Sequence, residues 1–199
     1  MNPDATPRPG RPRDADKDLA VLVAARHLLG EVGYQGATVV AIAKRAGVNT
    51  PAIYRRWPTR QALLEEAIHG PGGHNLPDST GDLRADLATW VRIFLARADS
   101  PAARAGVPGL LADSQTDQAR RRLLAIGAPV RKAFAELLDG AVDDGRIPPG
   151  VDVDLLFEIL SGTTTFHALA RGGDPEPFVS GFSEALYVMA AQGKPSQRG

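Results

Sequence analysis

The chain has 199 residues and a mass of 21.0 kDa, which allows one domain of ordinary size or two small ones. It contains no cysteine, which excludes a disulfide framework, a thiol nucleophile and a cysteine-ligated metal. A hydrophobic fraction of 43% is typical of a soluble globular protein, and no apolar run approaches the roughly 20 residues that cross a bilayer. The N-terminal segment has no apolar core like that of a secretory signal, so the expected location is the cytoplasm, with no membrane partner.

The charge is balanced overall but not along the chain. The 23 Lys+Arg and 23 Asp+Glu residues cancel, which at first argues against a nucleic-acid-binding protein. Residues 1–60, however, hold ten basic and five acidic residues, a net charge of +5, and residues 61–199 carry the opposite −5. Such an asymmetry indicates two parts with different roles, the first of them suited to a polyanion.

The first part of the chain is predicted to be a polar tail followed by four short helices. Residues 1–14 are rich in Pro, Arg and Asp and are expected to form a flexible basic arm. The first helix is predicted from residue 16 to Gly33, a glycine in the usual position after a helix end. Thr38, Asn49 and Thr59 each stand before a helical apolar pattern and are predicted N-caps. This part is expected to be one domain, residues 15–69.

The second part is predicted to be a separate helical domain. Residues 70–82 are rich in Gly and Pro and are expected to be a loop, so this domain should span 82–191, with a tail at 192–199. Its helices are predicted to begin at Leu83 and to occupy residues 102–113, 116–144, about 153–171 and 176–191. Pro129 leaves two alternatives for 116–144, one kinked helix or two helices. No strand alternation is present, so the fold class is all-α.

The second and third helices are joined by a turn that contains Gly47, which is the arrangement of a helix-turn-helix. In this motif the second helix directs its N-terminus at phosphate, and the third helix enters the major groove. Four apolar residues are expected to form the small core that fixes the angle between them: Ile42, Ala46, Val48 and Ile53.

The run TVVAIAKRAGVNTPAIYRRWPTRQALLEEAI (38–68) resembles the DNA-binding signature of the tetracycline-repressor (TetR) family, and residues 24–34 fit the family's first helix. The resemblance implies an N-terminal three-helix helix-turn-helix domain and a C-terminal helical domain for ligand binding and dimerisation. It therefore implies a homodimeric transcriptional regulator, more often a repressor than an activator. Such a regulator binds a palindromic operator in double-stranded DNA and is released by a small-molecule effector.

The resemblance also assigns residues to the DNA. Thr38, Arg56 and Arg60 are expected to contact phosphate, and Tyr54 the sugar-phosphate. Asn49, Thr50 and Pro51 are expected at the start of the recognition helix, and Arg55 is expected to contact a guanine edge. Further basic contacts are expected from Lys44 and from the arm residues Arg8, Arg11 and Arg13. The arm sequence RPGRPR resembles an A·T-hook, so it enters the minor groove or acts as a disordered segment that releases counterions. Trp57 is expected in the core.

The ligand site is predicted from aromatic and hydroxyl residues of the second domain. The candidates are Trp90, Phe94, Phe134, Phe157, Thr163, Thr164, Phe166 and His167, each of which could equally be plain core. His167 is the expected polar anchor, because three threonines precede it on the same helix. Helices 153–171 and 176–191 are the expected dimer surface, where small residues would permit close approach: Ser161, Gly162, Ser180, Gly181 and Ala185.

An enzyme is the main competing class of function. The four histidines show no metal-ligand spacing, and no nucleophile elbow, Walker loop or dinucleotide fingerprint is present. We therefore expect no catalytic residue, no metal and no cofactor. A helical adaptor that binds another protein remains an alternative for the second domain, but it leaves the pattern at 38–60 unexplained.

Overall fold

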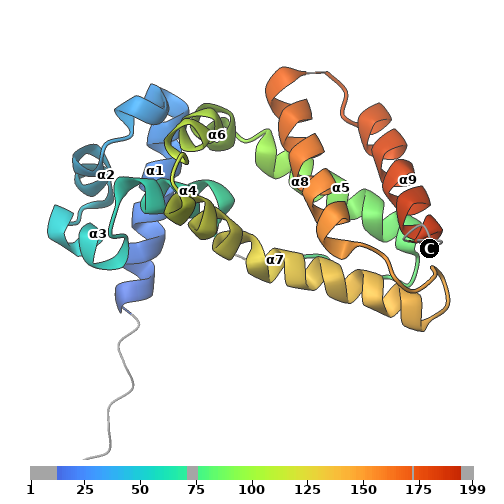
Figure 1. The fold of residues 1–199 in the computed structure, drawn as a ribbon. Helices are drawn as coiled ribbons and strands as arrows, with labels where there is room; N and C mark the ends of the chain where they lie inside the picture. Colours follow the sequence, from blue (N-terminus) through green and yellow to red (C-terminus); the bar gives the residue numbers. More distant parts are fainter. Residues whose placement is uncertain (1–12, 71–75, 172, 194–199) are drawn as a thin grey trace, which may run out of the picture.

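The structure is a computed structural model that describes residues 13–70, 76–171 and 173–193 (Figure 1). Its helices are α1 (Arg13–Gly36), α2 (Val39–Ala46), α3 (Thr50–Arg56), α4 (Arg60–His69), α5 (Leu83–Ala98), α6 (Pro101–Asp113), α7 (Asp117–Asp143), α8 (Val153–Ala170) and α9 (Glu176–Gln192). No strand occurs in these ranges, and the all-α prediction is confirmed. Residues 1–12 of the expected arm (1–14) and the last tail residues at 194–199 lie outside the described residues, whereas residues 13 and 14 belong to the first turn of α1.

The boundaries of the first four helices follow from their capping residues. Thr38, Asn49 and Thr59 each accept the backbone N–H three residues later, at 3.2, 2.8 and 3.0 Å, so the three predicted N-caps are confirmed. Gly33 has φ 71°, where the regular part of α1 ends, and Gly47 has φ 66° after α2. A side chain is strained at such a φ, so glycine permits the sharp turn between α2 and α3.

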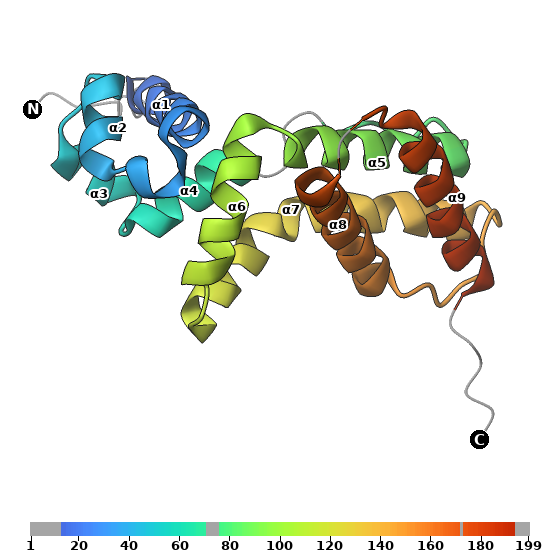
Figure 2. The ribbon, with the colours of Figure 1, turned by 90° about the horizontal axis from the view of Figure 1, so that it is seen from above.

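Helices α1–α4 form the head, a small bundle at one end of the molecule (Figures 1 and 2). Ile42 and Ile53 are buried in its core, and Ala46 and Val48 pack against them, as the helix-turn-helix prediction requires. Trp57 is also buried, as expected, and its indole N–H donates to Glu66 Oε2 at 2.8 Å. The angle between α2 and α3 is therefore fixed by apolar packing beneath them.

Helix α6 lies between the head and the rest of the chain in both views, and it packs closely on α1 and α4. Two glycines allow this approach. A Cβ at Gly109 would lie 2.3 Å from the ring of Tyr34, and a Cβ at Gly106 would lie 2.3 Å from Ile68. The hydroxyl of Tyr34 donates to Asp113 Oδ2 at 2.6 Å, which joins α1 to the end of α6.

Helices α5, α7, α8 and α9 form the body. Helix α5 packs against both α8 and α9, while α7 runs from beneath α4 and α6 along the body (Figures 1 and 2). Residues 117–143 are a single helix with Pro129 inside it, so the one-helix alternative is the observed one. The body core holds a chain of aromatic rings, in which Trp90 contacts Phe134 and Phe94 contacts Phe157 at centroid distances of 5.2 and 5.7 Å.

Candidate DNA-binding surface and ligand pocket

Helix α3 presents polar residues to solvent on the outer side of the head. Asn49, Pro51 and Tyr54 are exposed, Tyr54 over 48% of its surface, whereas Ile53 faces the core. Arg55 is exposed and makes no hydrogen bond or ion pair with the described residues. A guanidinium that the protein leaves available in this way can donate twice to the edge of a guanine.

Helix α2 and the start of α3 carry further polar groups that could contact DNA. The Oγ1 of Thr38 accepts the Ala41 N–H, so its own O–H remains a donor, and the helix N-terminus adds partial positive charge. Thr50, the first residue of α3, is partly exposed, and Lys44 is exposed near the end of α2. Helices α2 and α3 therefore offer phosphate oxygens three kinds of partner: the hydroxyls of Thr38 and Thr50, the N-terminus of α2, and the ammonium group of Lys44.

Two of the expected phosphate contacts are engaged within the head. Arg56 pairs with Asp18 of α1 at 3.2 Å, but both side chains are well exposed, so the pair is weak and can open. Arg60 donates from Nε to the Ala37 carbonyl at 3.0 Å and from a terminal nitrogen to the Tyr34 carbonyl. Its guanidinium also lies 4.5 Å from the centre of the Tyr34 ring. These contacts hold the corner between α1 and α2, and the expected phosphate contact of Arg60 stays a prediction.

The arm residues cannot be placed. Arg8 and Arg11 lie outside the described residues, as does the side chain of Arg13, the first residue of α1. The minor-groove prediction for this arm therefore stays a prediction.

A polar cluster joins the head to the body where α4, α6 and α7 meet. Arg122 of α7 donates to Gln61 Oε1 of α4 at 2.9 Å and lies 3.4 Å from Glu65 Oε2. Gln61 in turn donates to Ser114 Oγ at 3.2 Å, and that hydroxyl donates to the Leu110 carbonyl of α6. The Glu65 side chain is fully buried, and its other oxygen, Oε1, has no hydrogen-bond partner among the side chains that the structure describes. Burial raises the pKa of Glu65, partly offset by Arg122.

The body contains a pocket of about 420 Å³ that is also lined by α4 of the head and by α6, which packs on the head. Helices α4, α5, α6, α7 and α8 all contribute to it. Its lining residues are Ile68, His69, Phe94, Arg97, Ala98, Ala103, Val107, Gly127, Val130, Arg131, Phe157, Glu158, Ser161 and Thr165. The mixture of an apolar lining with a few polar groups is typical of a small-molecule site.

The predicted ligand residues do not form one site. Phe94 and Phe157 line this pocket, but Trp90 and Phe134 are buried behind them in the aromatic core. Thr164 is buried as well, and its hydroxyl donates to the Leu160 carbonyl of its own helix.

The other three predicted residues gather elsewhere. Thr163, Phe166 and His167 line a separate hollow between the end of α8 and the start of α9, where the His167 ring stacks on Phe178 at 3.7 Å. Because this hollow is not the pocket that Phe94 and Phe157 line, His167 cannot anchor a ligand held between those two rings.

Sequence reasoning missed most of the pocket lining, because five helix segments far apart in the chain supply it. Helical spacing could have identified two of the missed residues. Phe157, Ser161 and Thr165 are four residues apart, so they lie on one face of α8. Once Phe157 is taken as a lining residue, this spacing predicts Ser161 and Thr165 as lining residues too. No comparable signal marks Arg97 or His69, which stand in the last turns of their helices.

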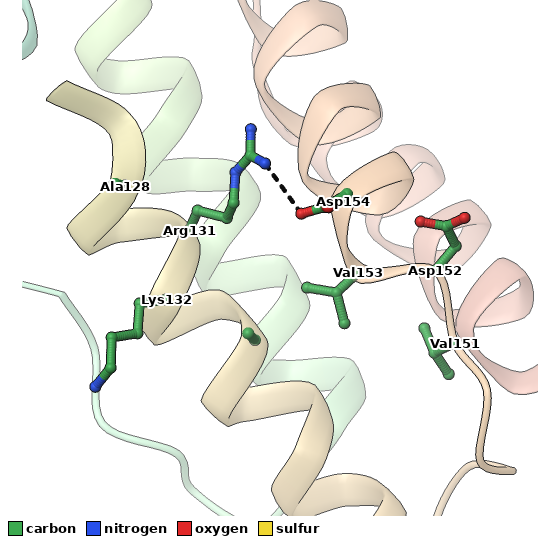
Figure 3. A pocket seen from close by; sticks show the side chains of 8 residues that line it. Ala128, Arg131, Lys132, Val151, Asp152, Val153 and Asp154 are labelled. Atoms are coloured by element: carbon green, nitrogen blue, oxygen red, sulfur yellow. Dashed lines mark hydrogen bonds and ion pairs between the residues drawn. The ribbon is translucent and has the colours of Figure 1, made fainter. Parts of the chain in front are cut away.

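A hollow on another part of the body involves Arg131 (Figure 3). It lies between α7 and the start of α8, has a volume of about 550 Å³, and is lined by residues such as Lys132, Val151 and Asp152. Arg131 turns toward Asp154 and pairs with it at 3.0 Å, while Lys132 points away. The pair joins α7 to the first turn of α8, and it offsets the charge of Arg131, which also lines the pocket of about 420 Å³.

The described residues contain no cluster of three or more histidine, aspartate and glutamate side chains that could hold a metal ion. None of their helices combines the length and the hydropathy needed to cross a membrane.

Together, the head and the body define a protein with an N-terminal helix-turn-helix domain and a second helical domain. A family model described as "Bacterial regulatory proteins, tetR family" matches residues 21–67, and one described as "Tetracyclin repressor-like, C-terminal domain" matches residues 76–180. The chain therefore belongs to the TetR family of DNA-binding transcriptional regulators, as its sequence motif indicated, and it is not an enzyme.

Similar proteins agree with this assignment over most of the chain. The DNA-binding transcriptional repressor TetR of Mycobacteroides abscessus is 30% identical over 169 residues, which cover 81% of the chain and 86% of that protein. The crystal structure of the TetR family transcription regulator SCO0332 has a TM-score of 0.68 and 30% identity, covering 87% of the chain and 98% of that protein. FadR from Bacillus subtilis, in complex with stearoyl-CoA, shares the fold at a TM-score of 0.60 and 19% identity, with 89% and 99% covered.

Proposed function

We propose that the chain is a homodimeric repressor that binds a palindromic operator and leaves it when a small molecule enters the body. The observation that carries the proposal is the pocket of about 420 Å³, which is lined both by the body and by Ile68 and His69 of α4. Helix α4 belongs to the head, so a ligand in the pocket touches the DNA-binding part directly. Because its target is the operator, the protein would act in the cytoplasm.

DNA binding would use the outer side of α2 and α3. Thr38, Lys44 and Thr50 are suited to phosphate, and Tyr54 and Arg55 are suited to sugar and base edges. Asn49 and Pro51 shape the start of α3, and the opening of the Arg56–Asp18 pair would release another guanidinium for phosphate. The arm, with Arg8, Arg11 and Arg13, would add counterion-releasing contacts.

Dimerisation would use the outer faces of α8 and α9. Leu155 and Phe166 of α8 are exposed, Phe166 over 69% of its surface, and Val188 and Met189 of α9 are exposed too. Small exposed residues lie on the same two helices, which lets two helix pairs approach: Gly162, Ser180, Gly181 and Ala185. An apolar surface of this kind on a globular protein marks an interface, and a second copy supplies the matching face by two-fold symmetry.

Release would follow from geometry. In a two-fold dimer the recognition helices must reach successive major grooves about 34 Å apart, or a multiple of that spacing. A ligand that shifts α4 and α6 against the body changes this distance and weakens DNA binding by the coupling free energy. The M. abscessus relative carries the name of a repressor, and the FadR neighbour binds an acyl-CoA in its crystal structure, which supports repression and a small-molecule effector.

The test is fluorescence anisotropy with labelled DNA from upstream of the protein's own gene. We expect the logarithm of the affinity to fall with the logarithm of the salt concentration, by about 0.9 per phosphate contact. Sedimentation of the free protein should give twice 21.0 kDa. A flat salt response would contradict DNA binding through the basic head, and a stable monomer would contradict the dimer.

A further inference from the structure

The exposed side chain of Asn49 offers DNA two hydrogen-bond donors, but its carbonyl oxygen is already in use. Asn49 directly precedes α3, and its Oδ1 accepts the Ala52 N–H at 2.8 Å, which caps the helix. Its Nδ2 amino group makes no hydrogen bond with the residues that the structure describes. An asparagine that reads adenine needs both atoms, because Oδ1 accepts from N6 while Nδ2 donates to N7. Asn49 cannot form this adenine pair without giving up its cap, whereas it can donate freely.

The other polar residues on the outer side of α2 and α3 share this excess of donors. Lys44 and Arg55 are exposed, carry only N–H donors, and have no partner among the described residues. The hydroxyls of Thr50 and Tyr54 can donate or accept, and they too are without a partner in the described part of the chain. Hydroxyls are therefore the main free side-chain acceptors that these two helices present.

Carboxylates, which would supply stronger acceptors, are missing from α2, α3 and the turn between them. The sequence has no Asp or Glu between Glu31 and Glu65. Glu31 pairs with Arg45 at 2.7 Å, and Glu65 is buried. Asp18 of α1 pairs with Arg56 at 3.2 Å. The outer side of α2 and α3 is thus suited to the acceptors of a base edge and poorly suited to its amino groups.

Guanine and thymine are the bases that fit such a surface. In the major groove guanine presents the acceptors O6 and N7 and thymine presents O4, whereas cytosine presents the N4 amino group and adenine the N6 amino group beside N7. The first residues of a recognition helix contact base edges. We propose that α3 selects keto bases: Asn49 donates to O6 of a guanine or O4 of a thymine, and Arg55 donates to a second base, a guanine. This inference rests on the proposed operator binding and names the class of base that Asn49 selects.

Exchange of the donor for an acceptor tests this role of Asn49. Asn49→Asp keeps one oxygen for the Ala52 N–H, so α3 keeps its cap, but the amino group becomes a carboxylate oxygen. The added negative charge weakens binding to all DNA, so base preferences are compared rather than affinities. Selection from a random-sequence library should replace guanine or thymine by cytosine or adenine on the same strand, at one position of each half-site. Unchanged preferences at every position would overturn the proposal.

Base analogues test the keto oxygen itself. At the selected position, 2-aminopurine in place of guanine removes O6, and 5-methyl-2-pyrimidinone in place of thymine removes O4. Asn49→Ser is the matched variant, because serine keeps a capping oxygen but lacks the reach and the amino group of asparagine. The analogue should weaken binding by about five- to tenfold more in the parent protein than in Asn49→Ser.

The comparison of two proteins removes the other effects of the analogue. Its altered base pairing is common to both proteins, so the difference between the two losses reports the contact of Asn49. Thermal unfolding without DNA should be nearly the same for the parent, Asn49→Ser and Asn49→Asp, since all three keep the cap. An equal loss in the parent and in Asn49→Ser would show that Asn49 only caps α3 or contacts phosphate, and it would overturn the proposal.

Separate outcomes keep this inference apart from the proposed function. If the parent protein enriches a palindrome but Asn49→Asp retains every base preference, the keto-base contact fails alone. If the parent enriches a single half-site whose keto base Asn49→Asp exchanges, the dimer fails while the contact stands. If the parent enriches no sequence, operator binding fails and the contact fails with it.

Discussion

Replacement of Arg122 by leucine should destabilise the protein in a strongly pH-dependent way. Arg122 is the ion-pair partner of Glu65, whose carboxylate is fully buried and already has one oxygen without a hydrogen bond. Breaking a buried pair by removal of one partner costs about 3–5 kcal/mol. The Arg122 side chain is 30% exposed and its Nε lies 3.4 Å from the carboxylate, so we expect a smaller loss, about 2–3 kcal/mol at pH 8.

The sign of the pH dependence follows from the raised pKa of Glu65. A carboxyl whose pKa is higher in the folded than in the unfolded protein stabilises the fold below its ordinary value of 4.5, and this contribution is lost as the pH rises through the folded value. Arg122 lowers the pKa of Glu65, so its removal raises the pKa of Glu65 in the folded protein further. The pH range over which the protein loses this stability then extends to higher pH. The deficit of Arg122→Leu should therefore be smaller at pH 5 than at pH 8, because a lower pH favours the protonated, neutral form of Glu65.

Thermal unfolding at fixed protein concentration measures this effect. For a chain of this size a deficit of about 2–3 kcal/mol lowers Tm by about 5–10 °C. Arg121→Leu, at the exposed neighbouring position, is the control and should change little. Glu65→Leu combined with Arg122→Leu should recover most of the loss, because an apolar pair replaces the buried charge. An equal deficit at pH 5 and pH 8, or no recovery in the double variant, would refute the reasoning.

Three further predictions concern the head and α6, which packs on it. Arg55→Ala should relax base preference at one operator position by about 1–3 kcal/mol, whereas Lys44→Ala should weaken all sequences alike, as binding to an operator library will show. Gly109→Ala should cost about 1–3 kcal/mol in urea unfolding, since its Cβ would lie 2.3 Å from the Tyr34 ring, while Gly140→Ala should be neutral or stabilising. Burial and the hydrogen bond to Asp113 raise the pKa of Tyr34 to about 12, so stability should fall between about pH 10 and 12, and Tyr34→Phe should remove that part of the fall.

The head could be predicted largely from the sequence because its signals are local. Thr38, Asn49 and Thr59 cap their helices through bonds to the backbone three residues later, and residue spacing alone reveals this. Ile42 and Ile53 could be assigned to the core for the same reason, since helical phase sets which side they face.

The parts that depend on contacts between distant residues could not be predicted in this way. The place of Arg60 in the motif predicts a phosphate contact, but it does not reveal that the guanidinium also donates to the Ala37 and Tyr34 carbonyls, more than twenty residues earlier in the chain. The cluster of Glu65 and Arg122 joins residues 57 positions apart, and neither shows its partner in the sequence.

The ligand pocket illustrates the same limit. The sequence leaves Phe94, Phe134 and Phe157 as candidates for either the ligand site or the core, and it does not show which of them reaches the pocket. That depends on how closely α6 approaches the head, which Gly106 and Gly109 permit. It also depends on where the ends of α4 and α5 meet. Both depend on how the helices pack against one another, and neither composition nor periodicity reveals that packing.

Selection of bound DNA from a random-sequence library tests the central claim most directly. A two-fold dimer whose α3 helices read successive major grooves should enrich a palindrome with half-sites whose centres lie about 10 base pairs apart, or a multiple of that spacing. Arg55→Ala should lose one base preference in each half-site, symmetrically. Enrichment of a single, non-repeated half-site, or of no sequence at all, would contradict a dimeric operator-binding regulator.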